Sequence, residues 1–296
     1  MLVSVPDLVH ELWREQSIWS RTADRMKAEI GRARSISLSL TVAAAAMGGL
    51  AGALAKPEPT ISRILIGLAA FALATLPLLR PGWSGQKLRD WTRARSVSEA
   101  LKSDVYLWLA HAGEYADDTA ATRLAEQTAK VRADGTDLLR FRIGITAEDR
   151  ELPLVTDLKS YFTVRVNYEI EHYYRARANK LQTALHRFRI AEICLAVLGA
   201  LIGAIAAATG GSTLIPWVAV VTTVTAALAV HIAATRYEFQ LIEFLRTADR
   251  LEQLRSQSAT AVPEALDKLA QSAEDVISIE NEAWMAKLAE EPPAHA

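Results

Sequence analysis

Apolar and polar stretches alternate along this chain, and four of the apolar stretches are long and almost free of charge. They cover residues 36–55, 61–79, 190–209 and 214–235. About 20 helical residues cross the roughly 30 Å hydrocarbon core of a bilayer. The stretches are apolar on all faces, as lipid or a very large core requires. A soluble helical protein would have too little polar helix to enclose them. We therefore predict an all-α membrane protein with four spans in two hairpins.

The two hairpins belong to a repeated segment of sequence. A shift of 155 residues superimposes the basic entry helix and the first span of each copy without a gap. It aligns Trp19 with Tyr174, Arg32 with Arg187, Arg34 with Arg189 and Gly48 with Gly203. An internal duplication explains this register. We predict two modules, residues 1–150 and 151–296, each a two-span hairpin with flanking polar helices.

Polar helices follow each hairpin, at about 86–140 and 236–290. Apolar residues recur at spacings of three and four in both, as in a coiled-coil seam: Leu101, Val105, Trp108, Ala112 and Tyr115, then Tyr237, Leu241, Phe244, Ala248 and Leu251. The second series extends the stripe of the fourth span, which predicts one continuous helix there. Gly135 interrupts the last helix of the first module. These seams could pack within one chain or between chains.

Charge is separated along the chain although the total is near zero. The 296 residues are 51% hydrophobic with formal net charge −1. This composition excludes a disordered chain and argues against a nucleic-acid binder. Lysine and arginine flank the polar ends of the spans and are sparse at the hairpin tips. The positive-inside rule then places both termini and the middle region in the cytoplasm, with both hairpin tips facing outward.

Small residues recur at four-residue spacing in the first and third spans. They are Ala44, Gly48 and Gly52 in the first and Gly199, Gly203 and Ala207 in the third. This pattern lets membrane helices approach closely. We predict that these residues form helix-packing faces.

Three polar residues within the spans are candidate pore or gate groups. Glu192 could line a pore entrance or pair with Arg189 one turn away, and the pairing is favoured. Thr223 and His231 share a stripe with Ala227 in the fourth span. Polar groups in membrane helices usually face inward, although a histidine near the end of a span can also reach lipid headgroups.

Motifs for catalysis are absent from the sequence. It contains no glycine-rich phosphate loop and no dinucleotide fingerprint. The histidines are scattered, and Cys194 is the only cysteine. Carboxylates of the polar helices, such as Glu252 and Glu274, are expected on solvated faces. We predict no catalytic residue, no metal and no cofactor.

Three segments carry a resemblance to a known family: LWREQSIWSRTADRMKAEIGRAR in the first module, and YFTVRVNYEIEHYYRARANKLQTAL and SIENEAWMAKL in the second. In these segments and in the arrangement of its modules, the chain resembles the SMODS and SLOG-associating two-transmembrane effector (SLATT) domains. The resemblance implies a bacterial protein of the inner membrane. It implies two tandem SLATT domains over nearly the whole chain. It also implies a membrane effector of conflict systems such as anti-phage defence, one that forms pores in response to nucleotide signals.

The leading hypothesis is therefore a non-enzymatic, oligomeric effector that permeabilises the membrane. Its expected partners are the lipid bilayer, further copies of the chain and a separate nucleotide-sensing or nucleotide-making protein. The alternative is a scaffolding membrane protein whose cytoplasmic helices recruit a partner. A membrane enzyme is the weakest of the three hypotheses, because no motif supports it.

Overall fold

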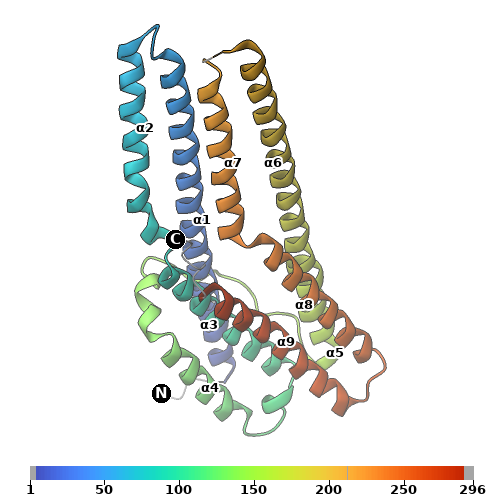
Figure 1. Ribbon diagram of the computed structural model, residues 1–296. Helices are drawn as coiled ribbons and strands as arrows, with labels where there is room; N and C mark the ends of the chain where they lie inside the picture. The colour runs from blue at the N-terminus through green and yellow to red at the C-terminus, as the bar shows by residue number, and fades with distance from the viewer. Residues whose placement is uncertain (1–4, 212, 290–296) are drawn as a thin grey trace. The chain divides into compact units, whose positions relative to one another are not determined.

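The computed structural model describes residues 5–211 and 213–289, and all regular secondary structure in that part of the chain is helical (Figure 1). The α-helices are α1 (Val5–Leu54), α2 (Pro59–Leu79), α3 (Gly85–Leu109), α4 (Ala120–Asp134), α5 (Leu158–Tyr161), α6 (Ala176–Thr209), α7 (Ile215–Thr235), α8 (Tyr237–Ser258) and α9 (Pro263–Ala289). Short 3₁₀ segments are η1 (Arg80–Trp83), η2 (Gly113–Tyr115) and η3 (Thr136–Arg142). The π-helical segments are η4 (Phe162–Val166) and η5 (Glu169–Arg175).

The four apolar stretches form the hairpins α1–α2 and α6–α7, as predicted. Each lies in a helix that is long and apolar enough to cross a membrane. Their ends follow from local chemistry: α2 begins with Pro59, where a missing N–H costs nothing, and Gly210 has a positive φ of 62° in the second hairpin turn. The chain is therefore an all-α membrane protein.

The outer surface of the first hairpin is apolar. Ile64, Phe71 and Leu78 of α2 are 57%, 70% and 77% exposed. Large apolar side chains in such numbers on one helix would be costly in water but are suited to lipid. The exposed face of α2 is therefore suited to contact with lipid.

The fourth span does not continue into the next helix, so the prediction of one continuous helix was wrong. Arg236 adopts a left-handed conformation with φ 50°, and its N–H donates to the Ile232 carbonyl as a cap. The Gln240 side-chain amide donates to the Thr235 carbonyl at 2.8 Å. These bonds satisfy carbonyls at the end of α7, so the chain can turn before α8 begins.

The predicted polar helices are present, with the break at Gly135. Gly135 caps α4, and the chain continues as η3. In the second half of the chain α9 starts at Pro263. The seam residues Leu101, Val105, Ala248 and Leu251 are at most 1% exposed. These four residues therefore pack within one chain.

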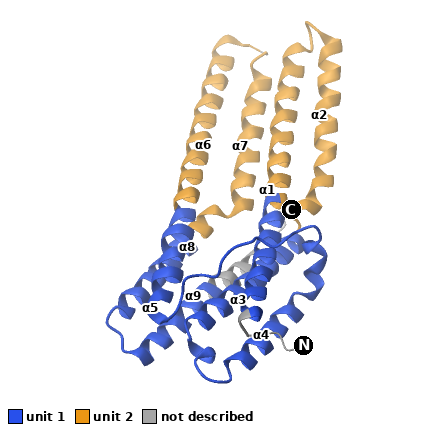
Figure 2. Cartoon of the chain, turned by 180° about the vertical axis from the view of Figure 1, so that it is seen from behind, with its two compact units in different colours: residues 1–28, 85–178, 242–296 blue, residues 29–84, 179–241 orange. Residues whose placement is uncertain are grey.

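The chain divides into two compact units that combine segments from both halves of the sequence (Figure 2). The polar unit contains residues 1–28, 85–178 and 242–296, and the membrane unit contains residues 29–84 and 179–241. This division separates membrane segments from polar segments. The predicted modules 1–150 and 151–296 divide the chain by sequence repeat and remain a prediction.

Candidate functional site

Helices α1 and α7, one from each hairpin, lie side by side within the membrane unit (Figures 1 and 2). A Cβ atom on Gly52 would lie 2.9 Å from Pro216 Cγ, and a Cβ on Gly49 would clash with Val220 Cγ2. Only glycine permits this approach of the two helices. Gly49 is a close-contact residue that the four-residue spacing did not single out.

The predicted small-residue positions contact different neighbours. Ala44 is buried against Ala69 and Ala72 of α2. Gly199 of α6 lies near α7, because a Cβ atom on Gly199 would lie 3.2 Å from Val221 Cγ1. A Cβ atom on Gly48 or Gly203 would meet no atom within 4 Å, and Ala207 is exposed. The six residues therefore do not form a single packing face within one chain.

A hydrogen bond joins the two helices of the first hairpin. The buried Ser62 hydroxyl of α2 donates to the Ala51 carbonyl of α1 at 2.8 Å. Ala51 is 1% exposed, so the bond is shielded from solvent. A bond to a backbone carbonyl in this setting fixes the register between the helices.

The polar stripe of the fourth span lines a cavity of about 390 Å³ in the membrane unit. Thr223, Ala227 and His231 of α7 form one wall. Further residues of α7 complete this wall, and the opposite wall comes from α1 and η1: Arg34, Ser37, Leu38, Thr41 and Trp83. The structure thus brings the predicted stripe together with polar residues of the first hairpin, which the sequence did not connect with it.

Glu192 lines a different cavity of about 690 Å³, with His186, Arg189 and Glu238. Within the described part of the chain no ion pair joins Glu192 to Arg189, so the expected local pairing is not formed. Phe188, which also lines this cavity, stacks on Tyr237 with ring centroids 5.9 Å apart. The three candidate gate residues therefore belong to two separate cavities.

A buried ion network occupies the core of the polar unit. Arg165 is 1% exposed, and its Nε donates to Glu274 at 3.0 Å. Arg165 also pairs with Glu169, one helical turn away. Lys102 binds Glu169 at 2.6 Å.

The expectation that Glu274 is solvated was wrong, because Glu274 is 6% exposed and is held by Arg165. Glu252 is solvated as expected, because its side chain is 38% exposed, and it pairs with Arg175.

The network is completed by Glu99, which pairs with Arg95 at 2.7 Å. Burial alone would raise the pKa of Glu99, but Arg95, Lys102 and Arg165 together lower it to about 2. The network therefore holds three cations and three carboxylates. Such a balanced set is needed because a buried charge without a partner costs several kcal/mol.

Local helix geometry aligns two members of this network. Arg165 lies in η4 and Glu169 begins η5, in a stretch whose π-type turns are wider than α-helical ones. Tyr161, which precedes η4, donates its hydroxyl to Glu274 at 2.8 Å. Its ring packs edge-on against Phe162. The aromatic residues near Tyr161 therefore support helix packing and the ion network.

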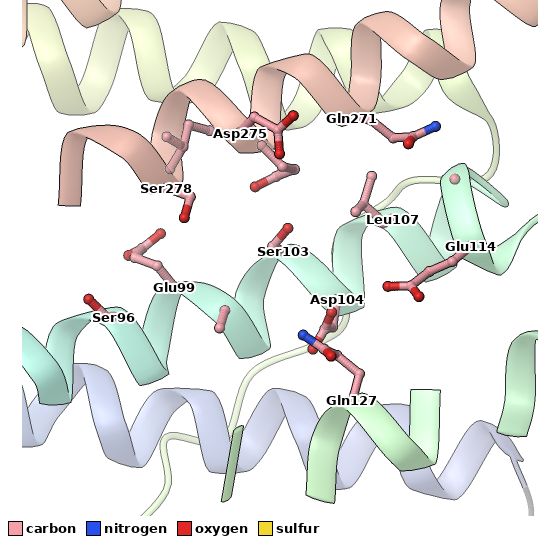
Figure 3. Close-up of a pocket in the computed structure, with 14 residues that line it drawn as sticks. Ser96, Glu99, Ser103, Asp104, Leu107, Glu114, Gln127, Gln271, Asp275 and Ser278 are labelled. Atoms are coloured by element: carbon pink, nitrogen blue, oxygen red, sulfur yellow. The ribbon is translucent and has the colours of Figure 1, made fainter. Parts of the chain in front are cut away.

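An acidic cavity of about 600 Å³ lies beside this network in the polar unit (Figure 3). Its lining contains carboxylates and no lysine, arginine or histidine; the carboxylates are Glu99, Asp104, Glu114, Glu274 and Asp275. Ser103 of α3 and Asp275 of α9 face each other across it, whereas Asp104 lies beside Gln127 of α4 (Figure 3). The lining therefore offers no cation to an anionic ligand.

Asp104 is the carboxyl group of this cavity with the most unusual environment. It is 6% exposed, its Oδ1 accepts from the Tyr115 hydroxyl at 2.8 Å, and its Oδ2 has no hydrogen-bond partner. Burial raises the pKa of Asp104 to about 7, although the Tyr115 hydrogen bond opposes this. Asp104 therefore changes its charge near neutral pH.

Among the described residues, no group of three or more histidine, cysteine, aspartate or glutamate side chains is arranged to hold a metal ion. Cys194 is exposed on α6.

The sequence did contain a signal for the burial of Glu274, which follows the buried Ala270 and Ala273 and precedes the buried Ile277 at helical spacing. Its place on an apolar stripe indicated burial, but nothing in the sequence indicated its partner Arg165.

These observations define a class: an all-α protein with two membrane hairpins and a polar helical unit stabilised by buried ion pairs. Residues 161–284 match the family model described as SMODS and SLOG-associating 2TM effector domain 1. This match identifies a SLATT domain in the second half of the chain, as the resemblance predicted for that half. Residues 17–123 match a model described as a protein of unknown function (DUF4231). No curated protein and no solved structure matches the chain.

Proposed function

We propose that this chain is a non-enzymatic effector of bacterial conflict systems that assembles from several copies and permeabilises the inner membrane. The observation that carries the proposal is a SLATT effector domain joined to four apolar spans, with a cavity between α1 and α7 that Arg34, Thr223 and His231 line. The positive-inside rule supports cytoplasmic termini.

The geometry favours a permeation pathway between several copies of the chain over a pathway through a single copy. Gly49 and Gly52 bring α1 and α7 so close that this part of the contact has no room for a conduit. Gly48 and Gly203, by contrast, leave open space beside α1 and α6. Small residues of this kind permit close helix contact between copies in a membrane.

A nucleotide trigger would act through a separate protein in this proposal. Nucleotides are polyanions, and the cavity of the polar unit has no lysine, arginine or histidine in its lining to bind their phosphates. A sensor protein that docks on the polar unit would supply the nucleotide site instead.

The test is induced expression in bacteria with a membrane-potential dye, together with dye release from liposomes containing the purified chain. Loss of potential and dye release are expected, and Gly48→Leu should reduce both because it fills the open space beside α1. Gly67→Leu is the matched control, since Gly67 of α2 is also open. Intact potential and sealed liposomes with the cognate trigger present would refute permeabilisation. A stable partner in pull-downs would then favour the scaffolding alternative.

A further inference from the structure

The cavity between α1 and α7 combines a cation with an apolar wall. Among its lining residues, Arg34 is the one with a permanent charge, and no carboxylate is present. Leu38, Ala227 and Val230 supply apolar surface. A site with one positive end and one apolar wall matches an amphiphile that carries a negative headgroup.

Arg34 lacks an anionic partner in the described part of the chain. Its buried Nε has no hydrogen-bond acceptor, and none of the described carboxylates lies within ion-pair distance of it. Arg236 adds a second positive charge near Arg34. A partly buried guanidinium is costly without an anion to receive its hydrogen bonds.

The depth of the cavity indicates which anion is available. Arg34 stands two residues before the first apolar stretch, and Trp83 follows the end of α2, where aromatic rings favour the membrane interface. Thr41 and Thr223 lie further along their helices, inside the spans. The charged end therefore lies at headgroup depth, and the apolar wall extends into the hydrocarbon.

We propose that this cavity binds an anionic glycerophospholipid. The phosphate accepts hydrogen bonds from the Arg34 guanidinium and from the Ser37 hydroxyl, with His231 on the opposite wall. An acyl chain lies along Ala227 and Val230. The lipid thereby connects α1 of the first hairpin with α7 of the second. A zwitterionic headgroup fits less well, because its own ammonium group competes for the phosphate.

The inference requires only that the chain lies in a membrane, so it can hold even if the proposed permeabilisation fails. The test is native mass spectrometry of the full chain in detergent, titrated separately with phosphatidylglycerol, phosphatidylcholine and soluble glycerol 3-phosphate. Phosphatidylglycerol should bind at least about tenfold more tightly than phosphatidylcholine, as expected for a charge-assisted contact.

Arg34→Gln should weaken phosphatidylglycerol binding about tenfold, the typical effect of losing a hydrogen bond to a charged group. Arg32→Gln is the matched control, because Arg32 is exposed on the same helix, outside the cavity, and its loss should change binding less than twofold. Ala227→Phe fills the apolar wall without a change of charge and should also weaken binding. Circular dichroism would verify that each variant is folded.

Three results would overturn the proposal. Equal losses in Arg34→Gln and Arg32→Gln would show that the charge acts non-specifically. Equal binding of the two lipids would show that the headgroup charge is not recognised. Glycerol 3-phosphate binding as tightly as the lipid, with the same dependence on Arg34, would assign the site to a soluble phosphate.

Discussion

The replacement Asp104→Asn gives a direct test of the electrostatics in the polar unit. Asparagine keeps the side-chain oxygen that accepts the Tyr115 hydroxyl, while it removes the ionisable group. The pKa of Asp104 is raised from 3.8 to about 7, mainly by burial, and the nearby Glu114 and Glu274 carboxylates contribute. The substitution therefore isolates the free energy required to ionise a buried carboxyl.

The sign follows from proton linkage. Below pH 3.8 the carboxyl is protonated in both the folded and unfolded states, so it adds no pH dependence. Between pH 3.8 and about 7 the folded chain keeps a proton that the unfolded chain has lost, and stability falls as pH rises. Above that range the loss is complete. One pKa unit corresponds to about 1.4 kcal/mol, so the interval from pH 5 to about 7 corresponds to about 3 kcal/mol.

The assay is thermal unfolding in detergent at pH 5 and pH 8, followed by circular dichroism. Asp104→Asn should gain about 3 kcal/mol over the natural chain on going from pH 5 to pH 8. For a unit of this size the gain corresponds to a rise in melting temperature on the order of 5–10 °C. Asp118→Asn removes a charge from an exposed position and should show no such gain. Parallel pH profiles for the natural chain and Asp104→Asn would refute the assigned pKa.

Three further predictions concern packing and the ion network. Gly49→Leu should destabilise the membrane unit by about 1–3 kcal/mol through overpacking against Val220, whereas Gly48→Leu should leave its melting temperature unchanged. Arg165→Met should cost about 3–5 kcal/mol in chemical denaturation because it leaves the buried Glu274 without its cation and Glu169 with Lys102 alone, and an effect below 1 kcal/mol would contradict the burial of the network. Ser62→Ala should cost about 1 kcal/mol in the same measurement, and no loss would contradict its bond to Ala51.

The sequence was sufficient for the spans because bilayer thickness dictates their length. The C-terminal ends of the predicted stretches 36–55 and 61–79 lie within one residue of the ends of α1 and α2, because a turn with prolines separates the two helices. The helix break at Arg236 was not predictable from apolar spacing, because an arginine in a left-handed conformation carries no periodic signal.

The site was predictable only in part, because residues that are far apart in the sequence meet in it. The stripe of Thr223 and His231 follows from helical spacing within one segment. Its opposite wall, which includes Arg34, comes from the other hairpin. Arg165 and Glu274 are 109 residues apart, and a single sequence gives no sign that two such side chains meet.

The balanced ion network restricts how this protein can change over evolutionary time. Its three cations are Arg95, Lys102 and Arg165, and its three carboxylates are Glu99, Glu169 and Glu274. A single neutral replacement at the centre leaves an unpaired buried charge, so substitutions are tolerated mainly when an opposite charge is lost with them. In a set of homologous sequences the residues at these positions should covary as compensating pairs. Homologues that keep the network should therefore keep α3, α9 and the π-helical stretch together.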